Sequence, residues 1–62
     1  MPAEIEYIYE AVRLGCRGLD SVYEDYIIDL VGRVGLYTLL DYKLLETCGV
    51  INGRQLYVLC EK

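Results

Sequence analysis

A β-hairpin is predicted by the stretch LLETCGVINGRQLYVLC, residues 44–60. Asn52 and Gly53 stand at its centre, and both residue types accept the positive φ angles that a two-residue type I′ turn requires. The flanking runs are rich in Leu, Val, Ile and Tyr, which is typical of β-strands. Counting outward from the turn predicts the pairs Ile51–Arg54, Gly49–Leu56, Cys48–Tyr57 and Thr47–Val58.

In this register Leu56, Val58 and Cys60 share one face of the second strand, because side chains alternate along a strand. Tyr57 and Leu59 share the other face. A competing interpretation continues a helix through Cys48 and leaves only a short hairpin. The sequence leaves both interpretations open.

Apolar residues at three- and four-residue steps predict three helices before the hairpin. The first covers residues 3–16, with Gly18 as a left-handed C-terminal cap. The second covers residues 22–34 and begins at a capping box formed by residues 21–24. The third is short and covers residues 36–42. The predicted fold is therefore α+β, with three helices followed by a C-terminal antiparallel β-hairpin.

Two local features of the helices have structural consequences. Gly15 lies on or beside the apolar face of the first helix, where it either admits a close neighbour or lets the helix fray. Asp29 and Arg33 are spaced as an i,i+4 ion pair on the second helix.

The chain has 62 residues, which is the size of one small domain, residues 1–62. Hydrophobic residues make up 55% of it, more apolar surface than a domain of this size hides in its own core. Charged residues interrupt every apolar run well before the ~20 residues of a membrane span. We therefore expect no membrane partner and assign the excess apolar surface to contact with another protein.

The chain has few of the residues that catalytic and metal-binding sites need. The chain has no histidine, a single serine, and three cysteines whose spacing is not that of a metal site. We expect no enzyme, cofactor, metal or small-molecule substrate, and we interpret Cys16, Cys48 and Cys60 as small apolar residues. The N-terminus lacks the pattern of a signal peptide, which predicts a cytoplasmic protein.

The seven tyrosines suit a protein interface, because each combines a large apolar ring with a hydroxyl group that can stay hydrated. Tyr26 lies at the edge of the second helix's apolar stripe and Ile28 lies outside it. Together with Tyr42, they are the interface candidates. The predicted function is a small, regulatory protein–protein interaction module that forms a homodimer or binds a protein partner.

The order of three helices and a hairpin with Arg54 just after its turn resembles the layout of a winged helix-turn-helix domain. That resemblance implies an alternative function, a divergent nucleic-acid-binding regulator in which residues 36–42 read the major groove. Lys43 and Arg54 would then contact nucleic acid. The helix offers no Arg, Asn or Gln to a base edge, Asp41 would repel phosphate, and the net charge of -4 opposes phosphate binding. Nucleic acid is thus the less favoured partner.

The segment from Gly49 to Arg54, with Leu56 and Tyr57, is also similar to short proteins of bacterial mobile elements. This similarity implies no activity.

Overall fold

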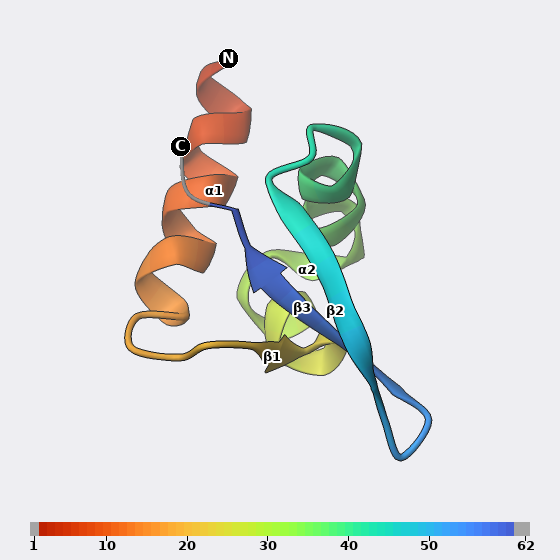
Figure 1. Ribbon diagram of the computed structural model, residues 1–62. Coiled ribbons are helices and arrows are strands. Elements are labelled where there is room, and N and C mark those ends of the chain that lie inside the picture. The colour runs from red at the N-terminus through yellow and green to blue at the C-terminus, as the bar shows by residue number, and fades with distance from the viewer. Residues whose placement is uncertain (1, 61–62) are drawn as a thin grey trace.

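The computed structural model describes residues 2–60, and Figure 1 shows the helices beside a small antiparallel sheet. The elements in chain order are α1 (Ala3–Gly15), β1 (Val22–Tyr23), α2 (Glu24–Asp41), β2 (Leu45–Ile51) and β3 (Arg54–Leu59). The α+β class is confirmed. The helices number two instead of three, and the hairpin belongs to a three-stranded sheet of order β1-β3-β2.

The hairpin turn is the one that the sequence predicts. Asn52 and Gly53 have φ angles of 54° and 75°, the positive values of a type I′ turn. β2 and β3 pair antiparallel, with Ile51 opposite Arg54. Because residues from Leu45 onward form this strand, the interpretation with a helix continuing through Cys48 is wrong.

The predicted register fails beyond Gly49, because a β-bulge interrupts the ladder between Thr47 and Gly49. Cys48 is the extra residue there, and a bulge shifts all later pairs by one position. Thr47 therefore lies opposite Tyr57, which the prediction had paired with Cys48. Alternation along β3 nevertheless holds, since Tyr57 belongs to the core and Leu59 packs against it, whereas Leu56 and Val58 do neither.

The predicted capping box at residues 21–24 is wrong. Val22 and Tyr23 instead form β1, which pairs with Tyr57 and Leu56 of β3. α2 begins only at Glu24, and no side chain caps its N-terminus. The side chain of Val22 is 8% exposed, so pairing with the sheet and burial in the core outweigh the roughly 1 kcal/mol of a helix cap.

α2 contains a break at Gly32, where φ is 76° and ψ is 173°. This combination is accessible essentially to glycine alone. The separately predicted third helix is wrong because residues 33–41 form the second half of α2. The break changes the direction of the helix, so that Ile27 before it and Leu36 after it are both fully buried.

α2 ends in a Schellman motif, in which two backbone N–H groups beyond the helix return to its last carbonyls. Lys43 N–H donates to Leu40 O at 3.0 Å and Leu44 N–H donates to Leu39 O at 2.9 Å. Lys43 occupies the left-handed position with φ of 57°, where glycine is usual. The motif turns the chain directly into β2.

α1 ends at Gly15, one residue before the predicted end. Gly18 has the expected positive φ of 81°, but it serves the turn after the helix. There Leu19 N–H donates to Cys16 O at 2.9 Å.

The core lies between the helices and one face of the sheet. Ile27, Leu36, Leu39 and Val12 are its most deeply buried side chains, each with 0% exposure. Tyr57 of the central strand closes the core at 6% exposure. The other core residues are Ile5, Val22, Leu44 and Leu45.

Replacing Gly32 by alanine is expected to lower the free energy of unfolding by about 1–3 kcal/mol, because the new side chain must adopt a backbone conformation that it strongly disfavours. A Cβ at this position meets no atom within 4 Å, so the loss reports backbone strain. Urea denaturation measures it. Arg33→Ala, in the adjacent exposed position, should change stability by less than about 0.5 kcal/mol. A Gly32→Ala protein as stable as the wild type would contradict the break.

Replacing Lys43 by glycine should raise the free energy of unfolding by about 0.5–1 kcal/mol. Glycine removes the left-handed strain of ~1–2 kcal/mol. It also makes the unfolded chain more flexible, which offsets part of that stabilisation. The matched control is Lys43→Ala, which removes the charge and keeps the strain. Equal denaturation midpoints for the two variants would refute this account.

Candidate interaction surfaces

Large apolar side chains remain exposed on both helices and at the end of the hairpin. Within residues 2–60 these are Tyr7, Leu14, Leu19, Tyr26, Leu30, Val34, Tyr37, Tyr42, Val50 and Ile51. Their positions in the fold decide which of them form one surface.

α1 and α2 pack against each other in opposite directions, through two glycines. A Cβ on Gly15 would lie 2.6 Å from Leu30 Cδ1, and a Cβ on Gly35 would lie 3.5 Å from Ile8 Cγ2. Tyr26 Oη–H also donates to Gly15 O. Of the two alternatives for Gly15, the close approach of another element is therefore correct.

The residues on either side of this contact line face opposite ways. On α1, Tyr9 follows the contact residue Ile8 and reaches the sheet, where its hydroxyl donates to Cys60 O at 3.1 Å. Tyr7 precedes Ile8 and is rotated the other way by about 100°, so it faces away from the sheet. On α2, Leu36 follows Gly35 into the core, and Val34 precedes it on the outer side.

The outer side of the two helices thus carries an apolar surface, here called the helical surface. Its members and their exposed fractions are Tyr7 79%, Leu14 55%, Leu30 38% and Val34 78%. Leu14 precedes Gly15 as Tyr7 precedes Ile8. None of the four belongs to the core or to the half-buried apolar side chains packed against it. Tyr37 is 54% exposed but lies near Tyr57 of the sheet, whose pKa is raised by burial and also by Tyr37, so Tyr37 is not part of this surface.

The break at Gly32 explains why sequence periodicity misplaces part of this surface. In an unbroken helix Val34 would share a face with Ile27, seven residues earlier, and would be buried. The break rotates the second half of α2, so that Gly35, Leu36 and Leu39 face the core. Val34 is then turned outward.

The three predicted interface residues do not form one surface. Tyr26 is 40% exposed at the border of the helical surface, beside Gly15. Ile28 is half-buried and packs against the core. Tyr42 is 48% exposed but caps the opposite end of α2 from Tyr26. Sequence reasoning missed Tyr7 and Leu14, whose seven-residue spacing on the polar side of α1 was the available signal.

The ion pairs among the described side chains are Arg13–Glu10 on α1 and Arg54–Asp25, which joins β3 to α2. The hydrogen bond from Arg13 also lowers the pKa of the Glu10 carboxyl group. The predicted Asp29–Arg33 pair is absent from that part of the chain, because the non-helical Gly32 lies between the two residues and destroys the i,i+4 geometry.

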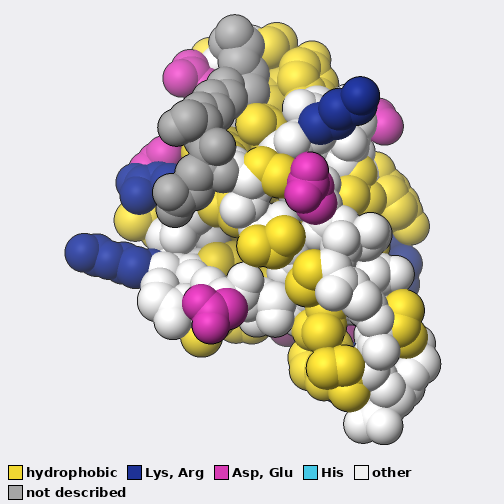
Figure 2. Space-filling model, viewed as in Figure 1, with side chains coloured by type: hydrophobic (Ala, Val, Ile, Leu, Met, Phe, Trp, Pro, Cys, Tyr) yellow, Lys and Arg dark blue, Asp and Glu magenta, His cyan; other side chains and the backbone are white. Residues whose placement is uncertain are grey.

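The far end of the hairpin, residues 49–55, is here called the arm, and it extends beyond the helices (Figure 1). Val50 is 62% exposed and Ile51 is 48% exposed, and apolar atoms are visible on the arm at the lower right of Figure 2. Arg54 ties the arm to the body, since it bonds to Asp25 Oδ2 at 2.6 Å and lies 4.2 Å from the ring centre of Tyr23.

The two predicted nucleic-acid contacts lie apart. Lys43 precedes β2 and Arg54 follows the turn after it, so the seven-residue strand separates them. Glu46 lies between them along the strand, and Arg54 is already engaged by Asp25. Lys and Arg side chains are scattered over the face seen in Figure 2. The structure does not bring Lys43 and Arg54 together into a basic surface.

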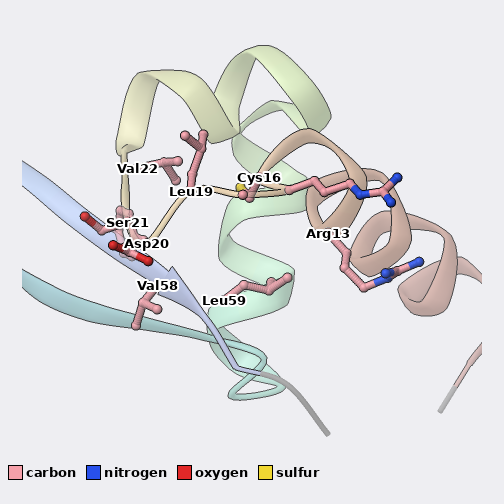
Figure 3. A pocket seen from close by; sticks show the side chains of 11 residues that line it. Arg13, Cys16, Leu19, Asp20, Ser21, Val22, Val58 and Leu59 are labelled. Carbon is pink, nitrogen blue, oxygen red and sulfur yellow. The ribbon is translucent and has the colours of Figure 1, made fainter.

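A shallow hollow of about 200 Å³ lies between the end of α1, the loop to β1 and the end of β3. Asp20 and Ser21 line its loop side and Leu59 its strand side, and the Arg13 side chain extends away from that loop (Figure 3). Cys16 also lines it, and burial raises the pKa of the Cys16 thiol. A thiol held protonated in this way is a poor nucleophile.

The three cysteines are free and lie in different parts of the fold. Burial and the nearby Glu46 carboxylate raise the pKa of Cys60, which is half-buried, whereas Cys48 is exposed at the bulge. Across residues 2–60 no group of three or more His, Cys, Asp or Glu side chains is placed to hold a metal ion.

Comparison with protein-family models, with curated proteins and with solved structures gives no match for this chain. The resemblance to winged helix-turn-helix domains therefore stays a prediction from the sequence. Neither described helix is both long and apolar enough to cross a lipid bilayer.

Thiol labelling of the native protein should be dominated by Cys48, because it is the exposed cysteine and the other two have raised pKa values. A chromogenic disulfide reagent at neutral pH should modify one thiol quickly and all three after unfolding. The control Cys48→Ser should lose the fast phase. A fast phase that persists in that variant would show that Cys16 or Cys60 is activated.

Proposed function

We propose that this protein is a protein–protein interaction module that docks its partner on the helical surface. The observation that carries the proposal is the gathering of Tyr7, Leu14, Leu30 and Val34 on the side of the helices that faces away from the sheet. Contiguous exposed apolar patches are uncommon on monomeric proteins and mark interaction sites.

Apart from Leu30, which packs on Gly15, the fold does not require these side chains to be apolar where they are. The core is complete without them, and Val34 leaves 78% of its surface in water. Burying apolar area stabilises a complex by roughly 25 cal/mol per Å². Tyrosine is also a residue type that interfaces favour over the rest of a protein surface. Covering this surface with a partner therefore lowers the free energy.

The other surfaces offer less. The arm presents two large exposed apolar side chains, Val50 and Ile51, and the hollow beside α1 is lined by the polar Asp20 and Ser21 as well as apolar groups. Nucleic-acid binding, the alternative, needs a continuous run of cations, and Arg54 is paired with Asp25.

The proposal is tested by capturing partners in the native host with a tagged chain after brief chemical cross-linking. We expect Val34→Asp to lose the proteins that the wild type retains, because a carboxylate cannot be buried unpaired in an apolar contact. The matched control Val50→Asp places the same charge on the exposed arm and should retain them. Both sites are exposed, so at a protein concentration too low for association both variants should keep the wild-type free energy of unfolding within about 0.5 kcal/mol.

Two outcomes would contradict the proposal. Capture unaffected by Val34→Asp would show that the helical surface is not the docking face. Binding of a polyanion at low salt that weakens steeply as salt rises would instead favour the nucleic-acid alternative.

A further inference from the structure

We propose that the occupant of the helical surface is a second copy of this chain, so that α2 of each copy packs on α1 of the other. This inference rests on the proposed function and names its partner. Area, charge and the level of the side chains along the helices each support it.

The apolar area matches one interface of ordinary size. Four side chains of roughly 100–200 Å² each, which are 38–79% exposed, present on the order of 400 Å² of apolar surface. A standard interface buries about 800 Å² on each partner, of which somewhat more than half is apolar. One such contact would use the helical surface fully.

The charges beside the surface complement each other between copies. Arg33 is exposed next to Val34 and makes no ion pair with another described residue. Glu6 is exposed next to Tyr7 and is likewise outside the ion pairs of that part of the chain. One side of the surface thus carries an open cation and the other an open carboxylate.

The contact between Gly35 and Ile8 places Val34 and Tyr7 at the same level along the two helices. Consider a two-fold axis that lies just outside the helical surface, midway between α1 and α2 and parallel to them. It lays α2 of one copy on α1 of the other without changing this level. Val34 then meets the Tyr7 ring of the second copy. Arg33, on the outer flank of α2, faces the outer flank of α1, where Glu6 lies one turn before Glu10.

A two-fold pair of this kind repeats each contact, so each substitution acts twice. Arg33 meets an open carboxylate at Glu6, because the charge of Glu10 is already balanced by Arg13. The pairing therefore makes a prediction about charge reversal that an unrelated partner would not satisfy.

The first experiment is sedimentation equilibrium of the purified full chain from low to high micromolar concentration. We expect a reversible dimer for the wild type and for Val50→Asp, and at least a 100-fold weaker dimer for Val34→Asp. A wild-type chain that stays monomeric throughout this range would overturn the inference. A dimer weakened by Val50→Asp and not by Val34→Asp would overturn it too, because the copies would then meet along the arm.

The second experiment reverses the charges one at a time and then together. Arg33→Glu and Glu6→Arg should each weaken the dimer about three- to tenfold, since exposed ion pairs contribute little singly and occur twice here. The chain with both changes should regain most of the loss, and more so at low salt. Additive losses in the double variant would refute the proposed pairing of α2 with α1.

Failure of this inference can be told apart from failure of the proposed function. If the pure chain is monomeric and captured proteins are still lost with Val34→Asp, the helical surface binds a different protein and the second copy is excluded. If Val34→Asp changes neither measurement, both proposals fail.

Discussion

The break at Gly32 is the constraint on which the rest of the structure depends. A straight helix over residues 24–41 would present one stripe to one neighbour, whereas the broken helix covers the core from two directions. Ile27 seals it on one side of the break, and Leu36 and Leu39 seal it on the other, all at 0% exposure. In a chain of 62 residues this arrangement lets a single segment do the work of two helices.

The short strand β1 also serves two purposes with few residues. Residues 22 and 23 complete the sheet on the free side of β3, and Val22 adds its side chain to the core. The end of α1 then meets the first half of α2 at Gly15, where only a residue without a side chain allows Leu30 to approach so closely. Sheet, core and helix contact are thus parts of one arrangement.

Local patterns were enough to predict the features that depend on neighbouring residues. The Asn52-Gly53 turn, the strands beside it and the first helix follow from spacing and turn chemistry. The features that failed depend on distant partners. Ser21 and Glu24 match a helix cap in sequence, but the partner that claims residues 22 and 23 lies more than thirty positions away in β3. Periodicity does not predict the bulge at Cys48 either, because the bulge changes only the register in which the two strands pair.

The candidate site was harder to predict than the fold for the same reason. Val34 continues the apolar stripe of residues 27 to 31 when the helix is treated as straight, so the sequence pattern turns it towards the core. Only the φ and ψ angles of Gly32 show that the phase changes there. The exposure of Tyr7, by contrast, follows from the sequence alone, because Tyr7 lies off the apolar stripe of α1.

The bulge in β2 has a consequence for the behaviour of the protein at high concentration. β2 is the outermost strand of the sheet, and a regular outermost strand offers its backbone to further strands without limit. The extra residue at Cys48 bends this edge and breaks the even spacing of its N–H and C=O groups, and the charge of Glu46 lies beside it. Growth by strand addition into fibrils is thereby hindered.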